Sequence, residues 1–192
     1  MSTAFRPATI DDAAILAELA NQAGEGLPLH VWQSMASPGV DAWDVGRQRA
    51  ARETGSFSYR NATLIEQDGI AAGCLIGYPI PDLPVEIATD LPAIFVPLQE
   101  LENLASATWY VNVLAVRPEL RRKGLGQQLL AQAEHLAVVA GLNGMSVIVS
   151  DANLAAKALY ERCGYRLQAS RVMVKDGWPN DGRNWILLTK RI

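Results

Sequence analysis

A basic turn with two glycines lies between an apolar segment and the longest helical pattern of the chain. The turn and the first helical residues are Arg121, Arg122, Lys123, Gly124, Leu125, Gly126 and Gln127. Glycine lets a ligand approach the main chain closely, and the first turn of a helix has unpaired N–H groups at the positive end of its dipole. The stretch from Lys123 to Gln127 is therefore predicted to bind phosphate oxygens, with further cationic side chains at its rim.

Two known classes of nucleotide-binding loop can be compared with this turn. A P-loop requires a Lys-Ser/Thr pair after its last glycine, and Gln127 and Gln128 stand there instead, which excludes it. A dinucleotide-binding fingerprint requires a third glycine inside the helix, where this chain has Leu129. Asp151 could serve as the acid that such folds direct to a ribose, so a dinucleotide-binding oxidoreductase stays an open alternative.

A second sequence pattern supports the interpretation of the basic turn as a binding loop. An R-x-x-G-x-G pattern begins at Arg121, and an N-x-x-A-x-x-L-Y-x-x-x-G-Y pattern begins at Asn153. Together they resemble the acyl-CoA loop and the following helix of the GNAT superfamily of N-acyltransferases, with Tyr165 in place of the usual phenylalanine. The resemblance covers about Tyr110 to Val174. Its motifs are specific for the superfamily but give almost no information about the substrate that accepts the acyl group.

The resemblance implies a set of site residues. A strand at residues 114–116 would offer main-chain groups to the pantetheine arm and the acyl carbonyl, and the turn would surround the pyrophosphate. Asn153 matches a residue that contacts the arm. Tyr160 matches a tyrosine near the thioester sulfur, so we predict it as the catalytic acid. The predicted cofactor-binding residues are Leu114, Ala115, Val116, Arg121, Arg122, Lys123, Gly124, Leu125, Gly126, Gln127 and Asn153.

The implied activity is an acetyl-CoA-dependent N-acetyltransferase acting on a primary amine of a small molecule or peptide, by direct attack in a ternary complex. The proton acceptor is not identified, because some relatives carry a glutamate on the strand after the cofactor helix and this chain has only apolar residues at 147–149. Glu100 and Glu102 are the nearest acids in sequence, and we interpret both as solvated residues. The missing glutamate favours an alternative, a non-catalytic acyl-CoA sensor.

Hydrophobic periodicity predicts the elements that position these residues. The expected order is an initial strand, helices at 10–23 and 42–53, strands at 57–66 and 70–78, a proline-containing excursion at 79–104 with one short helix, a strand at 108–116, a helix from 124 to about 140, a strand at 145–149, a helix at 152–163, and strands at 165–174 and 184–190. This order predicts an α/β (α+β) fold with a mixed central sheet of about six to seven strands flanked by helices. The resemblance implies that the two central parallel strands, 108–116 and 145–149, are splayed apart.

Composition narrows the class of protein. The 192 residues are 49% hydrophobic and 19% charged, which fits one domain, 1–192, and excludes a disordered or collagen-like chain. No apolar run could span a bilayer, and the start lacks a signal-peptide pattern, so we expect a cytoplasmic protein that does not bind membranes. Cys74 and Cys163 are interpreted as small buried residues. They and the two histidines offer no metal-ligand spacing, so no metal is expected.

Charge is distributed unevenly along the chain. The net charge of −3 argues against a nucleic-acid partner. Residues 61–116 contain seven acidic residues and no lysine or arginine, whereas residues 117–192 carry a net charge of +6. The acidic segment is expected to face a cationic amine at the acceptor entrance, and the basic segment an anion. The sequence leaves the acceptor, the acyl-chain preference and a homodimer open.

Overall fold

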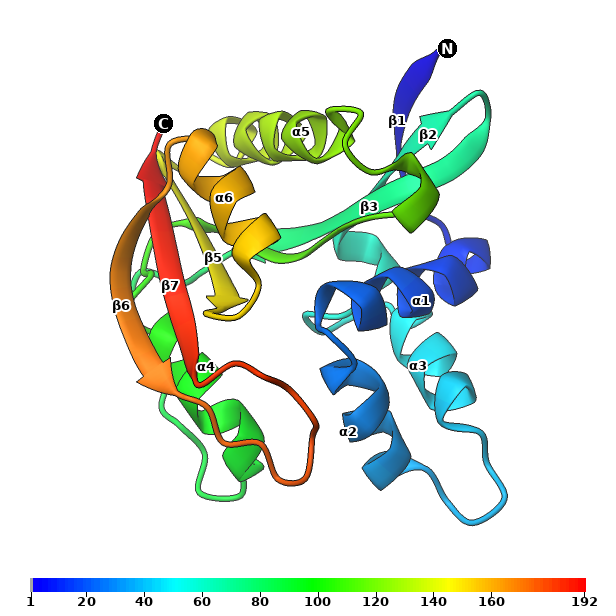
Figure 1. The fold of residues 1–192 in the computed structure, drawn as a ribbon, viewed down its shortest axis with the longest axis vertical. Coiled ribbons are helices and arrows are strands. Elements are labelled where there is room, and N and C mark those ends of the chain that lie inside the picture. Colours follow the sequence, from blue (N-terminus) through cyan, green and yellow to red (C-terminus); the bar gives the residue numbers. More distant parts are fainter. Residues whose placement is uncertain (1) are drawn as a thin grey trace. The chain divides into compact units, whose positions relative to one another are not determined.

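The computed structural model describes residues 2–192, which form seven strands and six α-helices among several short 3₁₀ turns (Figure 1). The strands are β1 (Thr3–Pro7), β2 (Ala62–Gln67), β3 (Ile70–Pro79), β4 (Trp109–Val116), β5 (Gly144–Ser150), β6 (Arg166–Val172) and β7 (Asn184–Arg191). The α-helices are α1 (Ala13–Ala23), α2 (Leu27–Met35), α3 (Ala42–Ala50), α4 (Val96–Glu102), α5 (Leu125–Val139) and α6 (Leu154–Arg162).

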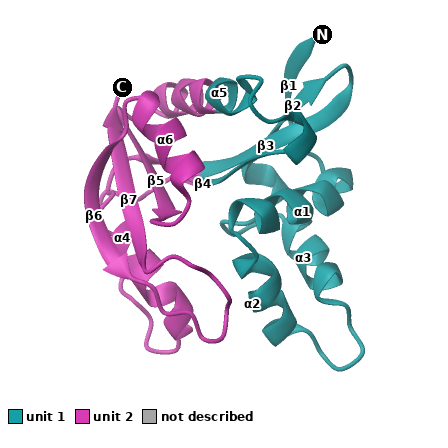
Figure 2. Ribbon diagram, in the orientation of Figure 1, with its two compact units in different colours: residues 1–77, 112–129 teal, residues 78–111, 130–192 magenta. Residues whose placement is uncertain are grey.

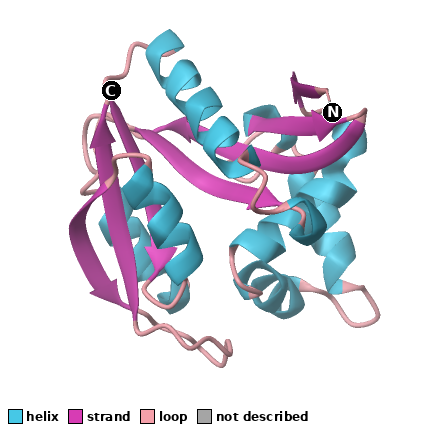
Figure 3. Ribbon diagram, turned by 45° about the horizontal axis from the view of Figure 1, so that its top comes forward, coloured by secondary structure: helices cyan, strands magenta, loops and turns pink. Residues whose placement is uncertain are grey.

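The strands form one mixed sheet in the order β1-β2-β3-β4-β5-β7-β6, which confirms the predicted fold class (Figure 3). Only β4 and β5 are adjacent in the sheet and parallel among the strand pairs whose register is defined. Their register joins Trp109 to Met145 and Val111 to Val147, and β4 then continues to Val116. This arrangement is consistent with the expected splay of the two central parallel strands.

The chain divides into two compact units, which are described separately (Figure 2). Unit 1 contains residues 1–77 and 112–129, and unit 2 contains residues 78–111 and 130–192. In unit 1, apolar residues of α1, β2, β3 and β4 form one buried cluster, in which Leu16, Leu64 and Val113 take part. This packing holds the second half of β4 in place.

Helices α2 and α3 pack on each other in unit 1. Gly46 of α3 lies so close to Trp32 of α2 that an added Cβ would stand 2.5 Å from the indole ring. The Trp32 ring also stacks on Phe57, with 5.9 Å between the ring centroids. A side chain at position 46 would therefore separate the two helices.

Unit 2 is built on antiparallel pairing of β5 with β7 and of β7 with β6. Helix α4 packs against β5, β6 and β7. Leu101 of α4, Met145 of β5 and Leu187 of β7 are all fully buried. The acidic carboxyl end of α4 is thereby held against the sheet of unit 2.

In the first 66 residues, two predicted boundaries were wrong and one helix was missed. The strand predicted at 57–66 begins only at Ala62, because the Ser58 hydroxyl accepts the Arg60 N–H and caps a 3₁₀ turn. Helix α1 ends at Ala23 with Gly24 as its cap, as predicted, but the helix α2, which follows Gly26 with its φ of 87°, was not predicted. The helix predicted at 42–53 ends at Ala50.

Later elements follow the predictions more closely. The excursion at 79–104 contains α4, which is the short helix expected there. Helix α5 begins one residue after the predicted position, and α6 begins after Asn153 rather than at residue 152. Within residues 2–192, no helix combines the length and apolar content needed to cross a membrane.

Candidate functional site

The turn from β4 into α5 lies in unit 1 and has an unusual backbone. The Arg117 N–H donates to the Ala72 carbonyl of β3 at 2.9 Å, which fixes the end of β4. Arg122, with a φ of 62°, and Gly124, with a φ of 81°, then adopt the left-handed region. A non-glycine residue rarely takes that conformation, so Arg122 carries backbone strain that the turn must compensate.

Main-chain N–H groups of this turn are available to a ligand. Within residues 2–192, the amides from Arg122 to Gln127 have no acceptor, and the Gln128 N–H, bonded to the Gly124 carbonyl at 3.1 Å, is the first to be paired in α5. Such a run of amides at a helix start binds anions. The stretch predicted to bind phosphate thus has unpaired main-chain N–H groups.

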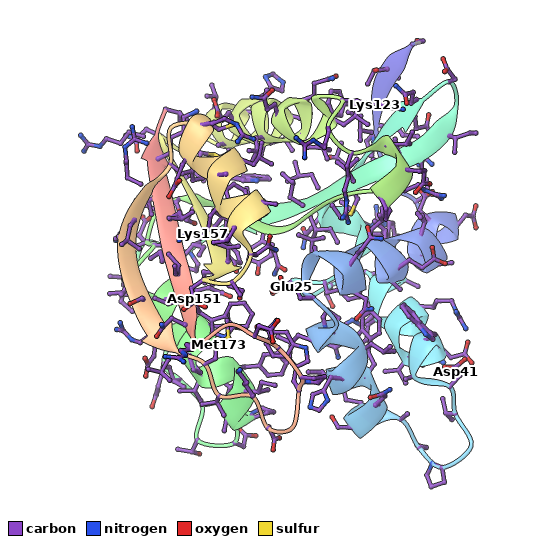
Figure 4. All side chains as sticks on the ribbon, in the orientation of Figure 1. Glu25, Asp41, Lys123, Asp151, Lys157 and Met173 are labelled. Atoms are coloured by element: carbon purple, nitrogen blue, oxygen red, sulfur yellow. The ribbon has the colours of Figure 1, made fainter. Side chains whose placement is uncertain are left out.

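Cationic side chains surround these amides. Arg121, Arg122 and Lys123 are all exposed, and Lys123 marks the turn in Figure 4. The Arg121 Nε donates to the Val116 carbonyl at 3.1 Å, so this guanidinium also closes the turn onto the strand end. Leu125 is buried and anchors the first turn of α5, while Gly126 is half-buried and Gln127 is exposed. This combination fits a diphosphate.

Alternate residues of β4 present their main-chain groups to opposite edges of the strand. Ala115 faces β3, because a Cβ on Gly73 would stand 2.4 Å from the Ala115 carbonyl oxygen. The Ala115 side chain is buried in the core of unit 1. Leu114 and Val116 therefore direct their main-chain groups away from β3. The Ala115 carbonyl thus lies against β3, and the predicted contact of Ala115 with the cofactor stays a prediction.

Asn153 and Asp151 lie in unit 2, just after β5. The Asn153 Oδ1 accepts the Ala156 N–H at 3.1 Å and caps α6, so half of its amide serves the helix. No residue from 2 to 192 accepts a hydrogen bond from the Asn153 Nδ2. Asp151 accepts the main-chain N–H groups of Arg183 at 2.8 Å and Asn184 at 3.1 Å (Figure 4). Asp151 thus holds the start of β7. This structural role accounts for the carboxylate without a contact to a ribose.

Tyr160 lies on α6 in unit 2 and is 5% exposed. Its ring centroid is 5.6 Å from that of Tyr165. Burial, with a smaller effect of Cys163, raises the pKa of the Tyr160 phenol, which therefore keeps its proton throughout the neutral range. The Tyr165 hydroxyl is fully enclosed without a partner, whereas the Tyr160 hydroxyl, which also lacks a partner among residues 2–192, is not enclosed. Tyr160 thus has a proton that a ligand can reach.

Glu102 ends α4, and the interpretation of this residue as solvated was wrong. It is half-buried, and loss of solvation raises the pKa of its carboxyl to about 7. Its carboxylate has no hydrogen bond or ion pair with any residue from 2 to 192. By contrast, Glu100 forms an ion pair with Arg171 at 2.6 Å and keeps 39% of its side chain exposed. Packing of α4 on the sheet, which no local sequence pattern reveals, separates the two acids.

The unpaired Glu102 carboxyl predicts a pH-dependent stability. Burial raises the pKa of this carboxyl from 4.5 to about 7. The stability that the protonated carboxyl contributes is therefore fully present below pH 4.5 and is lost as the pH rises through about 7. We expect Glu102→Gln to raise the free energy of unfolding at pH 8.5 by about 2 kcal/mol and to change it little at pH 4. Urea unfolding at the two pH values measures this difference, and an equal effect at both would contradict the burial of the carboxylate.

Several other predicted features can be located. Burial raises the pKa of the Cys74 thiol to about 12, as expected for a small core residue, whereas Cys163 is only half-buried. Within residues 2–192, no cluster of three potential metal ligands occurs. Two members of the acidic segment are paired, Glu66 with Arg6 and Glu100 with Arg171. The exposed acids of this segment that remain unpaired include Asp82, Glu86 and Asp90.

Comparisons with known proteins agree with this geometry. The model of the Acetyltransferase (GNAT) family matches residues 29–165. A solved structure described as an acetyltransferase shares 19% identity, covers 98% of this chain and 99% of its own, and has a TM-score of 0.66. An N-acetyltransferase from Staphylococcus aureus Mu50 shares 18% identity, covers 97% of this chain and 100% of its own, and has a TM-score of 0.65.

A third solved structure contains a ligand. It is a GNAT family acetyltransferase from Elizabethkingia anophelis with acetyl-CoA bound, which shares 19% identity, covers 68% of this chain and 75% of its own, and has a TM-score of 0.52. At these identities the structures show a common fold. No curated protein matches the chain.

Proposed function

Because the chain belongs to the GNAT acetyltransferase family, we propose that it is an acetyl-CoA-dependent N-acetyltransferase that acetylates a primary amine of a small molecule or peptide. The observation that carries this proposal is the run of unpaired amides from Arg122 to Gln127, at the position of the family's cofactor loop. A neighbour in the same fold holds acetyl-CoA, which supports the same co-substrate here. We also propose a cytoplasmic location, with no nucleic-acid or membrane partner.

The proposed binding residues divide by task. Amides from Arg122 to Gln127, together with the side chains of Arg121, Arg122 and Lys123, hold the diphosphate. The main chain at Leu114 and Val116 orients the pantetheine arm, and the Asn153 Nδ2 donates to it. The N–H groups near Leu114 stabilise the negative charge that develops on the thioester oxygen as the amine attacks. The side chain of Ala115 packs beneath them in the core of unit 1.

Tyr160 is the proposed proton donor to the departing sulfur. The amine must be neutral to attack, although the pKa of an alkylamine is about 10 in water. A new C–N bond then forms and the C–S bond breaks, which leaves a thiolate that needs a proton. The Tyr160 phenol keeps its proton at neutral pH and its hydroxyl is not enclosed, so it can supply this proton.

Thiol release from acetyl-CoA tests the proposal. The full chain is incubated with acetyl-CoA and, one at a time, a polyamine, an aminoglycoside and short peptides with a free amino terminus. We expect thiol release that depends on one of these acceptors, and mass spectrometry should find the acetylated amine. Tight acetyl-CoA binding without transfer to any acceptor would favour the non-catalytic sensor. The absence of a glutamate at residues 147–149 supports that alternative. Binding of NADH in place of acetyl-CoA would refute both.

A further inference from the structure

Helix α4 ends in Glu102, a carboxylate that can take a proton from the acceptor amine. Some relatives carry such a carboxylate on the strand that corresponds to β5. In that strand, β5, Val147 is buried and Ile148 half-buried, and the strand has no acidic residue. Glu102 precedes β4 by a short connection and belongs to unit 2 together with Tyr160. The acid and the proposed proton donor are thus parts of one compact unit.

Tyr110 belongs to the same unit, and both groups affect its ionisation. It lies on β4, is 5% exposed, and has its ring 5.6 Å from that of Tyr78 on β3, in an edge-on arrangement. Its pKa is raised well above the ordinary value, first by burial and then by the charges of Glu102, Tyr78 and Tyr160. Glu102 and Tyr160 therefore both lie close enough to Tyr110 for their charges to interact with it.

No cationic residue between positions 2 and 192 forms an ion pair with the Glu102 carboxylate. Helix α4 packs against β5, β6 and β7, and the strand β5 carries no charged residue. The cationic residues of the other two strands are Arg166, Arg171, Lys190 and Arg191. Arg171 is paired with Glu100, Lys190 with Glu134, and the Arg166 guanidinium donates to main-chain carbonyls. Nothing among residues 2–192 pairs with Glu102, so the carboxylate is available to a substrate.

We propose that Glu102 is the catalytic base, which takes the proton of the acceptor amine in the acetyl transfer proposed above. This assignment rests on the proposed function. The acceptor ammonium first gives one proton to the Glu102 carboxylate, which releases it to solvent. The neutral nitrogen then forms the new C–N bond and gives a second proton to the Glu102 carboxylate. The C–S bond breaks, and the sulfur takes one proton from the Tyr160 phenol. One proton passes from Glu102 to Tyr160 through solvent before the next turnover, so both residues return to their starting states.

The chemistry favours this carboxylate over other acids. A base works best when its pKa is close to the working pH. The raised pKa of Glu102, about 7, meets this condition, whereas the Glu100 carboxylate is neutralised by Arg171. The same unit holds the paired rings of Tyr110 and Tyr78, and rings of this kind attract ammonium groups. An alkylammonium acceptor is therefore the class of substrate that this group suits.

Glu102→Gln tests the proposal, with Glu100→Gln as the matched control on the same helix. The wild type and both variants are assayed with acetyl-CoA and the best acceptor of the amine panel, from pH 6 to 10. We expect Glu102→Gln to lower kcat/KM by about 100-fold at pH 7 and by less than about tenfold at pH 10, where the amine is neutral without help. Glu100→Gln should stay within about twofold of the wild type, and all three proteins should bind acetyl-CoA equally.

The outcomes separate this inference from the proposed function. Wild-type transfer with an unchanged rate and pH profile in Glu102→Gln would overturn the assignment of Glu102 and leave the acetyltransferase standing. A loss of equal size at every pH would indicate a structural role and would also overturn it. Absence of transfer by the wild type to any acceptor would refute the proposed function and this inference with it. Circular dichroism and acetyl-CoA binding show whether the variant is folded.

Discussion

Replacement of Tyr160 by phenylalanine is expected to slow acetyl transfer by about 100-fold or more while leaving acetyl-CoA affinity within about twofold. The substitution removes one hydroxyl from a side chain that is 5% exposed and keeps the ring that packs beside Tyr165. Since burial raises the pKa of the phenol, the wild-type residue is protonated at every pH used for assay. The loss should therefore appear in kcat, at constant size across neutral pH.

Tyr165→Phe is the matched control for this prediction. Tyr165 is fully buried, has its ring centroid 5.6 Å from that of Tyr160, and has an enclosed hydroxyl without a partner among residues 2–192. Removing a buried, unpaired hydroxyl costs no hydrogen bond, so stability should be equal or higher. The variant should acetylate at the wild-type rate. A wild-type kcat in Tyr160→Phe, or an equal loss in both variants, would remove Tyr160 from the chemistry.

The two catalytic proposals also predict different pH profiles. The donor Tyr160 has a raised pKa and stays protonated well above pH 7, whereas Glu102 titrates at about 7. The inflection of the kcat/KM profile near pH 7 should therefore disappear in Glu102→Gln, whose rate still rises toward pH 10 as the amine becomes neutral, and it should persist in Tyr160→Phe. This difference assigns the inflection to the carboxyl that must be ionised to act as a base.

Local signals made the turn of the proposed cofactor site predictable. The turn from Arg121 to Gly126 is read from glycine spacing, because left-handed backbone at Gly124 is a property of a few neighbouring residues. The strand β4 and helix α5 follow from hydrophobic periodicity. The Asn153 cap could also have been predicted, since asparagine before a helical pattern favours that position. Its role in holding α6 was missed because only the cofactor contact was considered.

Tertiary packing decided the features that the sequence did not reveal. Glu100 and Glu102 stand two residues apart on α4, yet one is paired with Arg171 and the other is half-buried and unpaired. The difference arises from the strands against which α4 packs, which lie far away in sequence. The direction of the Ala115 main chain likewise depends on the register of β3 at Gly73. Long-range register has no local signature in a single sequence.

The second large effect is expected at Gly124, where valine should weaken acetyl-CoA binding by tenfold or more. Gly124 has a φ of 81°, and open space lies where a Cβ would be placed, so the cost is backbone strain alone. A β-branched residue is strongly disfavoured at that φ, at about 1–3 kcal/mol. The turn is expected to shift to a more extended backbone, which moves the amides between Arg122 and Gln127 away from the diphosphate.

Gly141→Val supplies a control of the same kind at the other end of α5. Gly141 has a φ of 75° and also has open space at its Cβ position, so both variants should lose similar stability. Only Gly124→Val should raise the Kd for acetyl-CoA in calorimetry. Acetyl transfer from S-acetylpantetheine, which has no diphosphate, should be equally fast in both variants, because the strand β4 still orients the arm. An equal rise in Kd in the two variants would show that strain anywhere in α5 weakens binding, and that the amides of this turn do not hold the diphosphate.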